Sequence, residues 1–266
     1  LDKAEPLPTQ QFDSPESIIA AMCETIRSLM QRHPDAVAVG LGMPGWVYFQ
    51  KGILYQLTNV PVWNHEVPVR EVMQRELGIP VVLDNDANCM AYAEWKLGAG
   101  RGLQNIVCLT LGTGIGGGIV VNNRMLRGSR VSAGEVGQTS VCYNGRVGPF
   151  GNRGAVEEYI GNNEMAADAV ARYAAAGITR SVEDCTPYKL ELAARAGDAI
   201  ARQAYLDFAE KLGCLIMNLM YTLAPDAFII GGGVAKAGDL LFEPLDAQLK
   251  AQLFPVHYAN LRVLRA

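Results

Sequence analysis

Charge of either sign is scarce in this 266-residue chain. Charged residues make up 19% of it and the formal net charge is −4, so it lacks both the basic surplus typical of nucleic-acid binders and the charge density of a disordered chain. No apolar run approaches the roughly 20 residues that a membrane span needs, and no apolar segment follows the first six residues. We therefore expect no nucleic-acid or membrane partner, no signal peptide and a cytoplasmic location.

Metal-binding and disulfide patterns are also missing. Nothing reads Cys-x-x-Cys, and His33, His65 and His257 form no metal-spaced cluster. The six cysteines are scattered, mostly within apolar stretches. We interpret them as reduced, buried thiols of a cytosolic protein, with disulfides as the less favoured alternative.

What the chain does have is an alternation of strand and helix patterns over a composition that is 50% hydrophobic, enough for a sizeable core. A first helix is expected after Ser14, with Pro15 and Glu16 in its first turn. The expected strands cover residues 36–41, 81–84, 105–111, 119–121 and 226–230, and the expected helices residues 15–33, 87–97, 198–223 and 238–253. Residues 46–80 look irregular apart from a short helix near 70–77. The pattern predicts an α/β fold.

The most informative segment is glycine-rich, with five glycines among residues 112–118. Gly112, Gly114 and Gly117 match the dinucleotide-binding fingerprint, but that motif requires a helix next and a strand pattern follows instead. No Gly-Lys-Ser/Thr is present, so it is not a Walker loop. A strand–turn–strand hairpin can still bind phosphate through backbone N–H groups, with Thr113 adding a hydroxyl. A glycine turn kept only for packing is the alternative.

Polar residues gather at the end of an expected strand in Leu83-Asp84-Asn85-Asp86-Ala87-Asn88. In open α/β sheets, ligands bind at the carboxyl ends of strands. Asp86 is also well placed merely to cap the following helix. Because two aspartates and two asparagines exceed what capping needs, we favour a binding site.

Three further segments give weaker signals. Glu135 stands between small residues, where a backbone could approach a ligand, but it could equally be a solvated side chain. Glu157 could be a ligand or could simply favour a helix first turn. The strand at 226–230 runs into Gly231, Gly232 and Gly233 before a helix, which suits the edge of a nucleotide.

Together these segments resemble the ROK family of sugar kinases and sugar-responsive repressors, within the actin-like ATPase superfamily. The likeness rests on residues 83–88, 109–118, 133–137 and 225–233 in the family's order, and on a Gly-x-Pro-Gly turn within residues 40–45. It covers nearly the whole chain. The resemblance implies an α/β, two-domain actin-like ATPase (ribonuclease H-like) fold with a cleft between domains. The smaller domain would take residues 1–84 and the larger one residues 85–266.

The resemblance also implies roles for individual residues. Asp86 matches the general base that takes the proton from the attacking sugar hydroxyl. The residues expected to hold the sugar are Asn85, Glu135, Gln138, Glu157, Asn59 and Gly45. Gly112, Thr113 and Gly114 fall on the phosphate loop, and Gly231, Gly232 and Gly233 on the adenosine motif. The implied cofactors are ATP and Mg²⁺.

The chain departs from the family at its zinc motif. The family's Cys-x-Cys-Gly-x-x-Gly-Cys stretch corresponds here to residues 148–155, and its preceding histidine to Gln138. Every expected ligand is replaced, so we predict no structural zinc, with Phe150 and Ala155 supplying apolar packing in its place.

The chain also departs at both ends. It begins after the place of the family's first phosphate-binding hairpin and stops short of the usual last helix. We expect that these elements belong to a longer gene product.

The leading hypothesis is an ATP-dependent hexose kinase, with glucose as the first candidate substrate and a homodimer as the expected state. The alternative is a sugar-sensing repressor fragment without kinase activity, whose DNA-binding segment would lie upstream. A third reading, a nicotinamide-dependent oxidoreductase, requires a helix from Ile115 onward.

Overall fold

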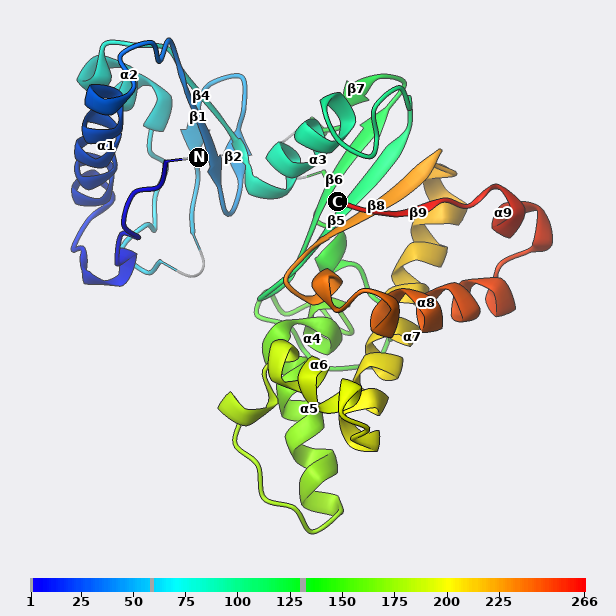
Figure 1. Ribbon diagram of the computed structural model, residues 1–266. Coiled ribbons are helices and arrows are strands. Elements are labelled where there is room, and N and C mark those ends of the chain that lie inside the picture. The colour runs from blue at the N-terminus through cyan, green and yellow to red at the C-terminus, as the bar shows by residue number, and fades with distance from the viewer. Residues whose placement is uncertain (1, 58–59, 130–132) are drawn as a thin grey trace. The chain divides into compact units, whose positions relative to one another are not determined.

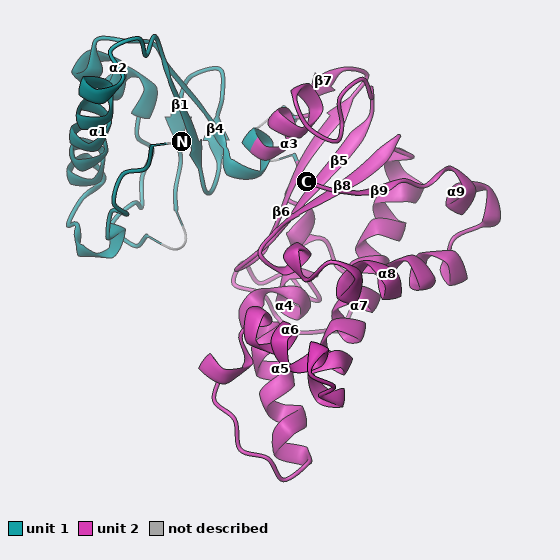
Figure 2. Cartoon of the chain, in the orientation of Figure 1, with its two compact units in different colours: residues 1–89, 127–133 teal, residues 90–126, 134–266 magenta. Residues whose placement is uncertain are grey.

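The chain forms two compact units, and the computed structural model describes residues 2–57, 60–129 and 133–266 (Figure 1). Unit 1 comprises residues 1–89 and 127–133, and unit 2 comprises residues 90–126 and 134–266 (Figure 2). The division between these two units falls inside helix α3, Asp86–Lys96. The first turn of α3 belongs to unit 1, because Cys89 in that turn donates from its Sγ to the Leu41 carbonyl oxygen of β1. Asn85, just before the helix, donates to the Gly45 carbonyl oxygen of the same unit.

Unit 1 is built on a short parallel strand pair. Strand β1 (Val39–Met43) pairs with β4 (Val81–Asn85), and β2 (Val47–Tyr48) pairs antiparallel with β3 (Ile53–Leu54). Helices α1 (Pro15–Arg32) and α2 (Val69–Leu77) complete the unit, α1 beginning at a Ser14–Ser17 capping box. Trp63, Met73 and Leu83 are fully buried between these elements. The sequence pattern missed β2 and β3, since two residues show no alternation.

Unit 2 contains a mixed sheet of five strands in the described part of the chain, in the order β7-β6-β5-β8-β9. The strands are β5 (Ile106–Leu111), β6 (Ile115–Val121), β7 (Arg124–Met125), β8 (Ala227–Gly232) and β9 (Val263–Arg265). Strands β5 and β6 form an antiparallel hairpin, whereas β5, β8 and β9 run parallel. The predicted Asn122-Asn123 turn joins β6 to β7, with φ of 50° and 60°.

The β5–β6 hairpin tests the hypothesis of a nicotinamide-dependent oxidoreductase, which requires a helix from Ile115 onward. Strand β6 starts at Ile115, earlier than the expected residue 119, and it leaves no helix after the glycines. The dinucleotide fingerprint therefore lacks the helix N-terminus that would bind pyrophosphate, and that reading is wrong.

Both faces of the sheet are covered, as Figure 1 shows. Val107, Leu109 and Leu111 of β5 pack in a core with α7, while Ile106 and Cys108 face the side that α3 covers. The helices of unit 2 beyond α3 are α4 (Glu157–Ile160), α5 (Asn162–Ala175), α6 (Pro187–Arg195), α7 (Ala199–Leu223), α8 (Asp239–Gln252) and α9 (Pro255–Asn260). The long helix α7 begins where predicted, capped by Asp198.

The cysteines form no disulfide within the described residues, and half of them are buried. All six lie within the described residues and are free, and Cys23, Cys108 and Cys185 are buried. Burial raises the pKa of Cys108 to about 12, which keeps it an unreactive thiol. Among the described residues, no helix is both long and apolar enough to cross a bilayer.

Candidate active site

The polar segment at the end of β4 turns directly into helix α3. The Asn85 side chain caps this helix, since its Oδ1 accepts the N–H groups of Ala87 (2.9 Å) and Asn88 (3.2 Å). Asp86 follows as the first helical residue and is exposed, with its Oδ1 also accepting the Ala87 N–H at 2.8 Å. Because Asn85 supplies the cap, Asp86 is not needed for capping and its carboxylate can face a ligand.

Asn85 also connects this segment to the Gly-x-Pro-Gly turn. Its Nδ2 donates to the Gly45 carbonyl oxygen at 3.1 Å. Gly45 has φ of 79°, and a Cβ there would lie 2.6 Å from the Gln56 carbonyl oxygen, so the turn requires glycine. The structure thus brings Gly45, Asn85 and Asp86 together in unit 1. Asn59, the other sugar-binding residue predicted for this unit, lies outside the described residues.

An ion pair between Asp84 and Arg127 stabilises the segment at residues 84–88. Asp84 is 7% exposed, and its Oδ2 accepts from Arg127 Nη2 at 2.5 Å and from Nε at 3.2 Å. Its Oδ1 accepts the Asn85 N–H at 2.9 Å and the Asn88 Nδ2 at 3.1 Å. The Arg127 guanidinium lies 3.9 Å from the centroid of the Phe49 ring. Sequence reasoning missed Arg127, because nothing near residue 127 signals a partner 43 positions away.

In unit 2, two glycine turns leave the same edge of the sheet. Parallel pairing sets Thr110 opposite Gly231 and Leu111 opposite Gly232, so the turn at residues 112–114 and the turn at 232–233 start side by side. Gly232 has φ of 96°, and a Cβ there would lie 2.3 Å from the Leu111 carbonyl oxygen. Cβ atoms at Gly112 and Gly233 would meet nothing within 4 Å. This edge therefore offers open backbone on which a phosphate could lie.

Gly231, the glycine of β8 that comes just before the second turn, has a different role. Gly231 is buried, and a Cβ there would lie 2.8 Å from the Met90 Cε and 2.9 Å from the Ala266 Cβ. It permits close packing of the strand, and the exposed glycines of this turn are Gly232 and Gly233.

Glu157 connects the first glycine turn to the segment that contains Gln138. Its Oε2 accepts the Ile115 N–H at 3.0 Å, and its Oε1 accepts from Gln138 Nε2 at 3.1 Å. A Cβ on Gly114 would lie 2.2 Å from that Oε2, so the carboxylate in its present position lies directly against the glycine backbone. The structure brings Glu157, Gln138 and the turn at 112–114 together. Glu135 is exposed, three residues before Gln138, and its carbonyl oxygen accepts the Gln138 N–H at 3.1 Å.

The first turn of α5 also adjoins the glycine turn at residues 112–114. The Asn162 N–H donates to the Gly112 carbonyl oxygen at 3.0 Å. In the same helical turn, burial raises the pKa of Glu164, and the nearby carboxylates of Glu158 and Glu157 add to that shift. The shift favours the neutral form of Glu164 more than in an ordinary glutamate, which reduces repulsion of an anion nearby.

The residues at the zinc-motif positions do not suit zinc. Gln138, Gly148, Phe150 and Ala155 provide no thiolate or imidazole, the ligands that structural zinc sites use. Within the described residues there is also no group of three or more His, Cys, Asp or Glu side chains arranged to hold a metal. Ala155 is fully buried as expected, but Phe150 is 52% exposed, so the predicted apolar packing by Phe150 is wrong.

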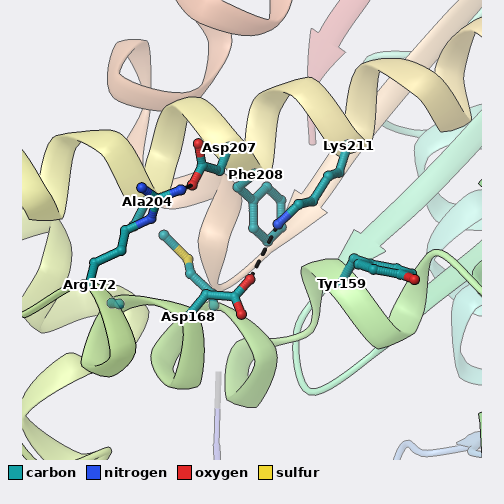
Figure 3. A pocket seen from close by; sticks show the side chains of 9 residues that line it. Tyr159, Asp168, Arg172, Ala204, Asp207, Phe208 and Lys211 are labelled. Carbon is teal, nitrogen blue, oxygen red and sulfur yellow. Dashed lines mark hydrogen bonds and ion pairs between the residues drawn. The ribbon is translucent and has the colours of Figure 1, made fainter. Parts of the chain in front are cut away.

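A separate shallow hollow lies between helices α5 and α7 (Figure 3). Its charged groups are already paired with one another, Lys211 Nζ with Asp168 at 3.3 Å and Arg172 with Asp207. No site residue predicted from the sequence lines this hollow. We interpret these pairs as a brace between the two helices.

Comparison with known proteins agrees with this geometry. A sequence model described as the ROK family matches residues 2–266. A glucokinase of Streptomyces coelicolor is 34% identical over 257 residues, covering 93% of this chain and 79% of that protein. A xylose repressor of Caldicellulosiruptor bescii is 27% identical over 258 residues, covering 93% of this chain and 64% of the repressor.

A solved structure gives the same relationship. The ROK family glucokinase from Streptomyces griseus, in complex with glucose and AMPPNP, superposes with a TM-score of 0.81 at 30% identity, covering 96% of this chain and 84% of that one. The predicted α/β fold of the actin-like ATPase type is thereby confirmed.

The first prediction concerns the metal. We expect prolonged treatment with a zinc chelator to leave the melting temperature of the protein unchanged, since the zinc-motif positions carry no ligand. Elemental analysis should find far less than one zinc per chain. Stoichiometric zinc, or a clear loss of stability on chelation, would contradict this expectation.

The second prediction concerns Arg127. Arg127→Met leaves the buried Asp84 carboxylate without its partner and should lower the free energy of unfolding by about 2–4 kcal/mol. Denaturant unfolding measures the loss, and Arg124→Met, at an exposed arginine nearby, is the matched control. Adding Asp84→Asn to Arg127→Met should recover part of the loss. Equal stability of Arg127→Met and Arg124→Met would show that the ion pair contributes nothing.

Proposed function

The chain belongs to the ROK family, and from this premise we propose that it is an ATP-dependent sugar kinase that phosphorylates a hexose hydroxyl, with glucose as the first candidate. The pair of open glycine turns at the carboxyl ends of β5 and β8 is the observation that carries the proposal. The solved relative was crystallised with glucose and AMPPNP, which supports a sugar and a nucleotide as the two ligands.

In this proposal Asp86 is the general base. It accepts the proton of the attacking hydroxyl while the oxygen bonds to the γ-phosphorus of ATP, and ADP leaves. An exposed carboxylate at the start of a helix, beside a capping asparagine, can reach such a hydroxyl. Asn85, Gly45, Asn59, Glu135, Gln138 and Glu157 hold the sugar. Carboxylates and amides suit this task because sugar hydroxyls both donate and accept hydrogen bonds.

The glycine turns take the nucleotide. Phosphate oxygens lie on the backbone of Gly112, Thr113 and Gly114, and the adenosine portion lies along the turn at 231–233. The described residues hold no group of three or more His, Cys, Asp or Glu side chains arranged for a metal, so Mg²⁺ would be held chiefly by the phosphates of ATP and would neutralise their charge. We also propose that the protein acts as a homodimer.

A sugar-sensing repressor is the second candidate, favoured by the similarity to the xylose repressor. The exposed Asp86 and the open glycine turns favour the kinase. A coupled ADP-release screen of the full-length gene product, across hexoses and N-acyl hexosamines, separates the two. Sugar-dependent ADP release supports the kinase, and sugar binding without ADP release supports the repressor.

The third prediction concerns the base. Asp86→Asn keeps the size of the side chain but removes the proton acceptor, so kcat should fall about 10²–10⁴-fold while sugar affinity stays largely unchanged. Coupled ADP release and calorimetric sugar titration measure the two quantities. Asp35→Asn, at an exposed aspartate of the same unit, is the matched control and should keep normal turnover. Near-normal turnover in Asp86→Asn would refute the assignment.

A further inference from the structure

The loop at residues 139–156, which replaces the zinc motif, is closed by backbone bonds. The Val156 N–H donates to the Thr139 carbonyl oxygen at 2.9 Å, and the Val141 N–H to that of Gly154 at 2.8 Å. Gly154 has φ of 71°, and a Cβ there would lie 1.8 Å from the Cys142 carbonyl oxygen. The loop therefore returns on itself tightly and presents Asn152 to Gln138.

A chain of side-chain hydrogen bonds runs from this loop to the phosphate turn. Asn152 Nδ2 donates to the Gln138 backbone carbonyl oxygen at 3.2 Å and to Gln138 Oε1 at 3.1 Å. Gln138 Nε2 donates to Glu157 Oε1 at 3.1 Å, and Glu157 Oε2 accepts the Ile115 N–H at 3.0 Å. We call Asn152, Gln138, Glu157 and the Ile115 N–H the amide relay.

Chemistry gives the amide relay a single direction. The ionised Glu157 carboxylate is acceptor-only, so Gln138 must turn its NH₂ group toward it. Gln138 Oε1 then faces Asn152, which must in turn present its own NH₂ group. If an acceptor replaced the donor at position 152, Gln138 Oε1 would face another acceptor and lose this hydrogen bond.

Backbone encloses the far end of the relay. Cβ atoms on Gly114 and Gly137 would lie 2.2 Å and 3.2 Å from Glu157 Oε2. The carboxylate thus has little room to move without moving the phosphate turn. At the near end, Asn152 Oδ1 is buried without a hydrogen-bond partner among the described residues. An unsatisfied buried acceptor destabilises the folded state, and the bonds that Asn152 donates to Gln138 offset this cost.

We propose that Asn152 is a positioning residue that acts through its hydrogen bonds to Gln138. It fixes the side chain of Gln138 and, through Glu157, the backbone at the end of the phosphate turn. The sugar-holding pair Gln138–Glu157 is thereby coupled to the segment that takes phosphate. The expected effect on the sugar KM rests on the proposed function. The expected effect on the backbone at Ile115 does not.

The fourth prediction tests the relay with Asn152→Asp. The new carboxylate has the shape of the amide and no donor, so the relay breaks at its first bond. Amide hydrogen exchange at Ile115 should accelerate about tenfold, because Glu157 is no longer held by a fixed Gln138 side chain and therefore binds this N–H less firmly. In the kinase assay the KM for sugar should rise about tenfold while kcat changes little, since Asn152 touches neither reacting atom.

Two variants make the test specific. Asn144→Asp introduces the same charge at an exposed position of the same loop and should alter neither exchange at Ile115 nor the sugar KM. Asn152→Ala removes the amide without adding charge, and should reproduce both effects if Asn152→Asp fails to fold. Unchanged exchange at Ile115 in the position-152 variants would overturn the relay.

The outcomes also separate this inference from the proposed function. Faster exchange with an unchanged sugar KM in an active enzyme would overturn the coupling, since Asn152 would then be only structural. A wild-type protein without sugar-dependent ADP release would refute the kinase proposal. The exchange measurement would still support or overturn the relay, because it needs no activity.

Discussion

The parallel pairing of β5 with β8 is the constraint on which the rest of unit 2 depends. Its register places Leu111 opposite Gly232, so both chains leave the sheet at one edge and both do so through glycine. Gly232 could not carry a side chain, because a Cβ there would collide with the Leu111 carbonyl oxygen, whereas the backbone at Gly112 and Gly233 is open. An exposed strip of backbone results, and oriented backbone N–H groups are what phosphate oxygens bind.

The three carboxylates of the candidate site differ in how many partners they have. Asp84 is buried and directs one oxygen to Arg127 and the other to Asn85 and Asn88. Glu157 directs one oxygen to the Ile115 N–H and the other to Gln138. Asp86 stays exposed at the start of α3. The proposed kinase would use this arrangement, because most of the catalysis of phosphoryl transfer comes from positioning.

Local patterns in the sequence predicted most of the fold. The helix start after Ser14, the long helix at 198–223, the buried strand at 105–111 and the Asn122-Asn123 turn depend on neighbouring residues, and the structure confirms them. The candidate site was found in part, because glycines and clustered polar residues stand out in a sequence. Features set by distant partners were missed: Arg127 beneath Asp84, Asn152 behind Gln138, and Asn85 in place of Asp86 as the principal cap. The expectation for Phe150 was wrong because the packing of a loop residue depends on tertiary contacts that no local pattern encodes.

The most direct test of the account is a crystal structure of the full-length protein with a hexose and a non-hydrolysable ATP analogue. The account predicts an Asp86 carboxylate oxygen about 2.6–3.2 Å from the sugar hydroxyl that faces the γ-phosphate. It also predicts that the phosphates contact the backbone of residues 112–114. A sugar bound away from Asp86, or phosphates bound away from both glycine turns, would contradict it.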